Sequence, residues 1–136
     1  MSEESYVPRE LYEQYRKAMV QVIPRDAPPK LKEKLQTMLS YGNEYSLKER
    51  LNRLVSQLDA PTRERIGTDL DSFIRRVVAT RNYLTHGDER HKKIALTGPD
   101  EYYEVNRILR AILSMHLLKM VGVPEAQVAA RVFRRM

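Results

Sequence analysis

The amino-acid sequence predicts an all-α protein, and three observations support this fold class. Only five of the 136 residues are glycine, and residues that favour helices, such as leucine, arginine and glutamate, are abundant. Apolar side chains recur every three or four residues, which places them on one face of a helix. No segment shows the two-residue alternation of a half-buried strand. A chain of this length can bury one core, so we expect residues 9–136 to form a single helical domain after a flexible N-terminal arm, residues 1–8.

Helix-ending residues divide the chain into about five to six helices. Proline and glycine mark most of the ends, because proline cannot continue a helix and glycine often follows the last turn. The predicted helices are 9–23, 28–41, 46–58, one from near Thr62 or Thr68 to about 85, 100–121, and a short basic helix, 124–136. Gly67 leaves the start of the fourth helix open. The polar stretch from His86 to Pro99 is predicted to be an exposed loop.

Charge and composition exclude several classes of function. The chain carries 24 Lys and Arg against 18 Asp and Glu, and this excess favours a polyanionic partner such as nucleic acid or an anionic membrane surface. The absence of cysteine excludes disulfides, thiolate metal sites and a catalytic thiol. No metal-ligand spacing and no glycine-rich phosphate loop occur, so we expect neither a metal nor a cofactor. Without a signal peptide or a membrane-length apolar run, we expect a cytoplasmic protein. A membrane partner is not expected, because the basic tail with Arg131, Arg134 and Arg135 has few bulky apolar residues.

One arginine lies on the apolar face of the fourth predicted helix. Arg81 follows Val77 by four residues and precedes Leu84 by three, so it projects into the apolar stripe. An arginine keeps its charge, and burying that charge alone is very costly. We therefore expect Arg81 to meet a carboxylate, a packed partner chain or an anionic ligand.

Two more polar residues share this end of the helix. Asn82 and His86 are four residues apart and point the same way, and Gly87 permits the backbone to turn out after them. Together with Arg81 they supply a fixed positive charge, an amide and a group that titrates near neutrality. Metal-free RNA cleavage uses such groups: histidine moves a proton at the ribose 2′-OH or the leaving oxygen, and arginine stabilises charge on the phosphate.

Arg81 and His86 do not face the same way on a regular helix. Five residues separate them, which corresponds to about 140° around the helix axis. Convergence on one phosphate therefore requires either a distortion of the helix at His86 or residues from a second subunit.

The pattern Arg81-Asn82-x-x-x-His86, followed by Gly87, resembles the Arg-x4-6-His motif of the HEPN superfamily. The segments SLKERLNRLVSQL and FIRRVVATRNYLTHGD, with the long apolar helix after them, are similar to the C-terminal HEPN domains of ApeA-type bacterial anti-phage proteins. The likeness covers roughly residues 30–122. It implies an up-down, HEPN-like helical bundle that forms a homodimer, in which both copies of the motif line one cleft. Such clefts cut single-stranded RNA without metal and leave a 2′,3′-cyclic phosphate.

The resemblance also implies a biological setting. ApeA-type proteins carry a large domain before the HEPN domain, so we expect a sensor that precedes this domain or is a separate protein, and a role in abortive infection. Some toxin-type members have a tyrosine where this chain has Asp88. The nucleotide-transfer modification that silences those toxins is therefore not expected here. The alternative function is a non-catalytic HEPN module that binds nucleotide or mediates dimerisation.

Each candidate residue also has a structural explanation. For the motif, the explanation is a helix cap in which Arg81 pairs with Asp69, Asp71 or Asp88. His116, within the apolar face of the fifth predicted helix, is expected to be a hydrogen-bonded core or interface residue. Weaker RNA contacts are predicted at Arg75 and Arg76, with surface ion pairs as the alternative, and at Lys92 and Lys93, with a solvated loop as the alternative. Tyr83 is predicted either to contact RNA or to seal the dimer.

Overall fold

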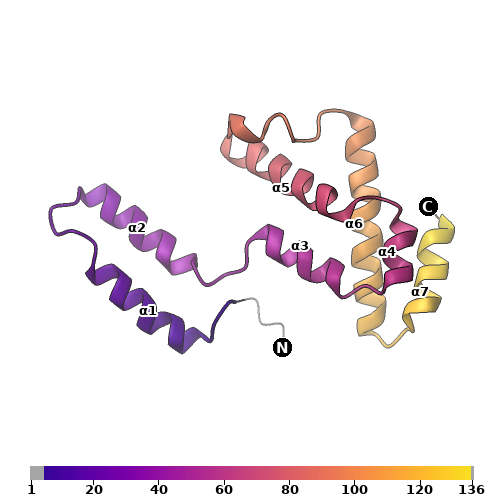
Figure 1. Cartoon of the computed structure of the whole chain (residues 1–136), viewed down its shortest axis with the longest axis horizontal. Coiled ribbons are helices and arrows are strands. Elements are labelled where there is room, and N and C mark those ends of the chain that lie inside the picture. The colour runs from indigo at the N-terminus through magenta and orange to yellow at the C-terminus, as the bar shows by residue number, and fades with distance from the viewer. Residues whose placement is uncertain (1–4, 136) are drawn as a thin grey trace. The chain divides into compact units, whose positions relative to one another are not determined.

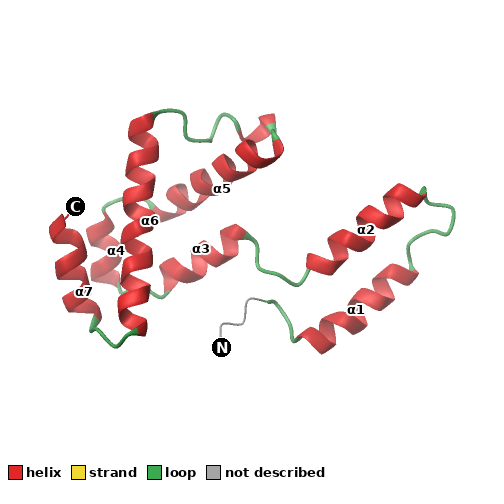
Figure 2. Ribbon diagram, turned by 180° about the vertical axis from the view of Figure 1, so that it is seen from behind, coloured by secondary structure: helices red, strands yellow, loops and turns green. Residues whose placement is uncertain are grey.

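The structure is a computed structural model, and it describes residues 5–135, with side chains as far as Arg134. Every regular element in this range is helical, with seven α-helices and two short 3-10 helices (Figures 1 and 2). The predicted all-α fold class is confirmed. The chain divides into two compact units with the boundary between Ser46 and Leu47. The assignment of 9–136 to one domain stays a prediction.

The first unit contains a pair of helices. α1 (Arg9–Gln21) follows Pro8 directly, and α2 (Pro29–Tyr41) starts on a proline, whose fixed φ suits the first helical turn. The Tyr12 hydroxyl on α1 donates a hydrogen bond to the Leu39 carbonyl on α2. Neither helix contributes a buried residue. The main core of the protein is therefore not in this unit.

The predicted N-terminal arm is described only in part, because residues 1–4 lie outside the described residues. Ser5 forms an isolated antiparallel bridge with Glu44. Tyr6 donates its backbone N–H to the Asn43 carbonyl over 3.1 Å. These two residues of the arm are thus bonded to the segment that follows α2.

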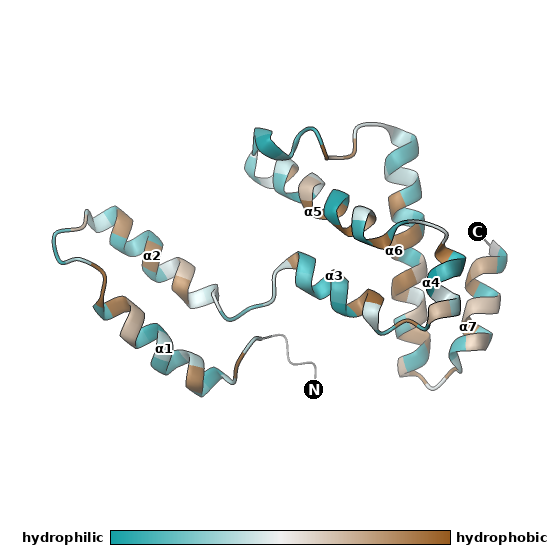
Figure 3. Ribbon diagram, viewed as in Figure 1, coloured by the Kyte–Doolittle hydropathy of each residue, from teal (hydrophilic) through white to brown (hydrophobic). Residues whose placement is uncertain are grey.

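The second unit holds the core. It consists of α3 (Leu47–Ser56), α4 (Ala60–Ile66), α5 (Leu70–His86), η1 (Glu89–His91), α6 (Pro99–Met120), α7 (Glu125–Val132) and η2 (Phe133–Arg135). Within this unit α6 lies between α5 and α7 (Figures 1 and 2). Apolar residues, shown in brown, lie in the middle of α6 and in the adjoining part of α5 (Figure 3). The buried apolar side chains form one cluster: Leu51, Val55, Leu58, Ile66, Phe73, Ile74, Ile108, Ile112, Met115, Val128 and Ala129.

The fourth predicted helix is two helices. Gly67 adopts a left-handed conformation, φ 68°, and ends α4. Asp59 caps the start of α4 by accepting the Thr62 N–H over 2.7 Å, and Asp69 caps α5 by accepting the Asp71 N–H over 3.1 Å. The uncertainty about the helix start therefore reflects a real break, with a helix on each side of it.

The stretch from His86 to Pro99 is not wholly exposed, so that prediction is wrong in part. Ala95 and Leu96 are buried, with 5% and 7% of their surface exposed. Leu96 donates its N–H to the Thr80 hydroxyl oxygen on α5 over 2.9 Å. The apolar residues near the end of this polar stretch pack inward, and they hold the segment against the helix that carries the motif.

Candidate active site

Helix α5 stays regular to its last residue, His86. The next residue, Gly87, adopts φ 62° and donates its N–H to the Tyr83 carbonyl over 2.9 Å, which is an ordinary helical hydrogen bond. A distortion at His86 is therefore absent. Arg81 and His86 lie about 140° apart around α5 and about 7.5 Å apart along its axis. One chain alone does not turn both side chains toward a single phosphate.

Arg81 is exposed, and the expectation that it lies in a buried apolar stripe is wrong within this chain. The stripe is buried at Ile74, which is 2% exposed, and half-buried at Val77, but Leu84 is 66% exposed. Helix α3 packs along α5, and the last turns of α5 extend beyond the core. The apolar face thus continues past the part of the helix that its own chain covers.

None of the carboxylates predicted as structural partners of Arg81 pairs with it in the structure. Asp69 and Asp71 lie about 18 Å and 15 Å away along a regular helix. Asp88 accepts two hydrogen bonds from the Arg90 guanidinium, 2.9 and 2.8 Å, and lies 3.5 Å from His91. The hydrogen bonds from Arg90 are the main cause that lowers the pKa of Asp88 to about 2. Asp88 therefore pairs with Arg90 and not with Arg81.

Asn82 is the neighbour that Arg81 does contact. The guanidinium donates a hydrogen bond to the Asn82 amide oxygen over 3.2 Å. The oxygen of Asn82 is then an acceptor for Arg81, and its NH2 group remains a donor that can face a ligand. His86 is exposed one helical turn after Asn82. A cation, an amide donor and an imidazole thus occupy the last turn and a half of α5.

The weaker RNA candidates have different surroundings. The Arg76 guanidinium lies 2.6 Å from the Glu101 carboxylate, so an ion pair occupies it. Lys92 lies 3.3 Å from Glu89, whose hydrogen bond raises the pKa of Lys92. The pair at Arg76 is the surface ion pair that was its structural alternative, whereas the alternative for Lys92 was a solvated loop. The other three candidates are exposed or half-buried, and none of them forms an ion pair among the described side chains. They are Arg75, Tyr83 and Lys93.

His116 has a structural role, as predicted. Its Nε2 lies 2.7 Å from the Leu54 carbonyl oxygen. Since a carbonyl only accepts, Nε2 carries the proton in this contact. The half-buried ring therefore joins α6 to α3 and is not available for proton transfer from this nitrogen.

Four arginines outside the predicted set share a surface. Arg107 and Arg110 of α6, with Arg131 of α7 and Arg134 of η2, line one groove. The residues come from separate helices, so no spacing rule groups them. The only signal in the sequence is that both segments are rich in arginine.

Neither a metal site nor a membrane span is found in the described part of the chain. No group of three or more His, Cys, Asp or Glu residues there could hold a metal ion. None of the described helices is both long enough and apolar enough to cross a membrane.

Comparison with known families identifies the type of domain. The sequence matches the family described as Apea-like HEPN over residues 1–127. The chain belongs to the ApeA-like HEPN family. The match confirms the resemblance and extends it beyond residues 30–122 to include α1 and the start of α7. HEPN domains are often ribonucleases of defence systems, and the all-α fold of this HEPN domain agrees with the family. Searches of curated proteins and of solved structures gave no match.

Proposed function

We propose that this ApeA-like HEPN domain is a metal-independent endoribonuclease that cuts single-stranded RNA at a site shared by two subunits. Arg81, Asn82 and His86 form the site. One observation carries the proposal: an exposed arginine and an exposed histidine lie at the end of a regular helix, about 140° apart. The family match supports the activity, and the protein would act in the cytoplasm during anti-phage defence.

The proposed reaction is an intramolecular transesterification. His86 accepts the proton of a ribose 2′-OH, and the 2′ oxygen attacks the adjacent phosphorus. A new P–O2′ bond forms while the P–O5′ bond breaks, and the leaving 5′ oxygen takes a proton from water. The products are a 2′,3′-cyclic phosphate and a 5′-OH end. Arg81 and the NH2 group of Asn82 stabilise the charge that develops on the non-bridging oxygens.

The second subunit provides what one helix cannot. In a twofold dimer, Arg81 of one protomer and His86 of the other can face the same cleft even though they diverge on each α5. Leu84 supports this arrangement, because it is 66% exposed three residues after Arg81. An apolar side chain next to the motif is suited to burial against a second copy.

A cleavage assay in excess EDTA tests the proposal. Purified protein is incubated with single-stranded RNA, and the ends of the fragments are identified. We expect cleavage with cyclic phosphate ends, and losses of 100-fold or more, roughly, in Arg81→Ala and in His86→Ala. His91→Ala is the matched control, since that imidazole lies beside Asp88, and it should cut normally. Cleavage of an all-2′-deoxy strand, or cleavage that EDTA abolishes, would contradict this chemistry.

A further inference from the structure

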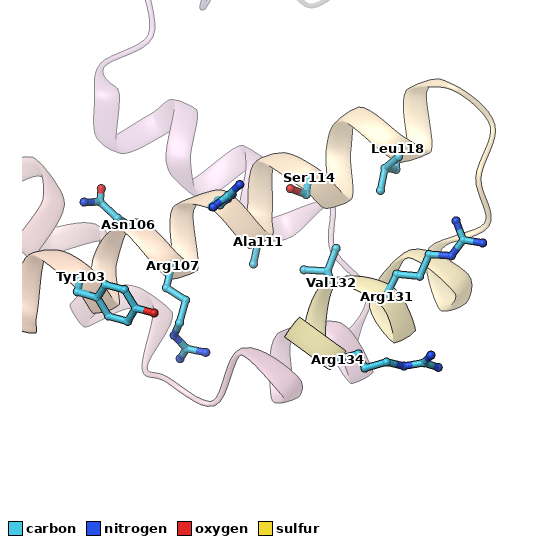
Figure 4. Close-up of a pocket in the computed structure, with 10 residues that line it drawn as sticks. Tyr103, Asn106, Arg107, Ala111, Ser114, Leu118, Arg131, Val132 and Arg134 are labelled. Carbon is cyan, nitrogen blue, oxygen red and sulfur yellow. The ribbon is translucent and has the colours of Figure 1, made fainter. Parts of the chain in front are cut away.

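A groove between α6 and the two elements that follow it, α7 and η2, is lined by four arginines. It encloses about 930 Å³. Figure 4 shows side chains from α6 on one wall and from α7 and η2 on the other. The groove is lined by Tyr103, Asn106, Arg107, Arg110, Ala111, Ser114, Leu118, Arg131, Val132 and Arg134. We call this surface the α6–α7 groove.

The charge of the α6–α7 groove is largely uncompensated. Arg107 pairs with Glu104, through contacts of 2.9 and 2.6 Å. The other three arginines, Arg110, Arg131 and Arg134, are exposed and form no ion pair with an acid in the described part of the chain. No aspartate or glutamate lines the groove. Unpaired guanidinium groups that line one groove favour the binding of an anion there.

The groove is a fixed part of the fold. Helix α7 is held against α6 because its Val128 and Ala129 are buried in the core. The Glu125 carboxylate accepts the Asp59 N–H over 3.0 Å and lies 2.8 Å from Lys119. Arg131 of α7 and Arg134 of η2 therefore extend from a backbone that this packing holds in place.

The uncharged lining suits nucleobases. Tyr103 is 73% exposed, so its ring is accessible to a ligand. Ala111, Leu118 and Val132 give the groove an apolar component between the arginines. Phosphates can meet guanidinium groups while bases stack on an aromatic ring or lie on apolar side chains, which is how single strands are bound without base pairing. A base-paired duplex hides its bases and offers less to this surface.

We propose that the α6–α7 groove binds single-stranded RNA at a site separate from the end of α5. α5 and α7, the helix that contributes to the other wall of the groove, lie on opposite sides of α6 (Figures 1 and 2). The inference deepens the proposed function and rests on it for the choice of RNA over DNA. The groove would hold a flank of the substrate strand and contributes no group to the bond that breaks.

Fluorescence anisotropy with a labelled single-stranded RNA tests this site. All proteins carry His86→Ala, so the RNA is not cut during the measurement. Replacing the three unpaired arginines should weaken binding about tenfold or more and reduce the slope of log K against log salt by about 2, since each phosphate contact contributes about 0.7. The triple variant is Arg110→Gln, Arg131→Gln and Arg134→Gln.

A matched control separates a site from net charge. Replacing three exposed basic residues of the first unit removes the same charge and should change affinity less than about twofold. This control carries Arg25→Gln, Lys30→Gln and Lys34→Gln. Equal losses in both triple variants, with unchanged circular dichroism, would overturn the proposal.

Tyr103 and competing polyanions complete the test. Tyr103→Ala should weaken RNA binding about tenfold. Tyr103→Phe keeps a stacking ring and should bind normally. Equal competition by polyglutamate overturns a nucleic-acid site, and equal affinity for DNA of the same sequence overturns the choice of RNA. If the wild type fails to cut RNA but the triple variant still loses binding, the cleavage proposal fails and the groove stands.

Discussion

Leu96 donates its backbone N–H to the Thr80 hydroxyl oxygen over 2.9 Å, and both residues are buried. Thr80 in turn donates to the Arg76 carbonyl over 2.7 Å. Thr80→Val keeps the shape of the side chain and removes the acceptor, leaving a buried N–H without a partner. We expect a loss of about 1–3 kcal/mol in the free energy of unfolding. Urea titration measures it, with exposed Thr85→Val as the control that should cost less than about 0.5 kcal/mol.

The same contact fixes the segment that follows the motif. In Thr80→Val, the Leu96 amide should exchange with deuterium faster than in the wild type, while the amides of α6 stay protected. Unchanged exchange at Leu96 would show that burial alone holds this segment.

The ion pair next to this contact gives the protein an acid-sensitive element. Glu101 accepts the Thr97 N–H and pairs with Arg76, and these interactions lower its pKa from 4.5 to about 2. A lowered pKa in the folded state means that the stabilisation is present above about pH 4.5 and is lost as the pH falls toward 2. We expect Glu101→Gln to lower Tm near neutral pH. The difference in Tm from the wild type should shrink as the pH falls through this window, and a constant difference would contradict the assignment.

The end of α5 depends on a left-handed residue. Gly87 has φ 62°, and a Cβ there would meet nothing within 4 Å, so only backbone strain opposes a side chain. Gly87→Ala should cost about 1–2 kcal/mol of stability. Gly87→Asn should cost distinctly less, because asparagine tolerates this conformation. Chemical denaturation compares the two variants, and equal losses would rule out φ as the cause.

Helical periodicity distinguishes two methionines on α6. Met115 is completely buried, whereas Met120 is 83% exposed. Met115→Ala should cost about 2–5 kcal/mol, because it removes apolar contacts and leaves a cavity. Met120→Ala should stay within about 0.5 kcal/mol in the isolated protomer. Thermal unfolding measures both, and similar losses would mean that the core is misplaced.

Local pattern predicted most helices because each is an independent amphipathic segment. The apolar spacing of α5 and α6 and the prolines before α1 and α2 are readable without tertiary information. The separation of α4 from α5 was ambiguous, since a single glycine, Gly67, can interrupt a helix or lie within it. The burial of Leu96 was missed because its partner, Thr80, lies sixteen residues earlier on another element.

The residues of the candidate site could be proposed from the sequence, but their exposure and their neighbours could not. Arg81, Asn82 and His86 are grouped by their spacing in the sequence, and their role as an active site stays a prediction. The exposure of Arg81 depends on how far the core covers α5, which a helical projection cannot give. The α6–α7 groove combines Arg110 with Arg131, which lie on different helices, and only the packing of those helices brings the two residues together.

Mixing two inactive variants tests the shared site most directly. Arg81→Ala retains His86, and His86→Ala retains Arg81, so a heterodimer has one intact pair contributed by opposite subunits. After subunit exchange, verified by a tag on one variant, cleavage should recover to about a quarter of the wild-type rate, since about half of the dimers are mixed and each has one of two pairs. If verified heterodimers stay as inactive as each variant alone, Arg81 and His86 do not cooperate across a dimer, and the central claim is wrong.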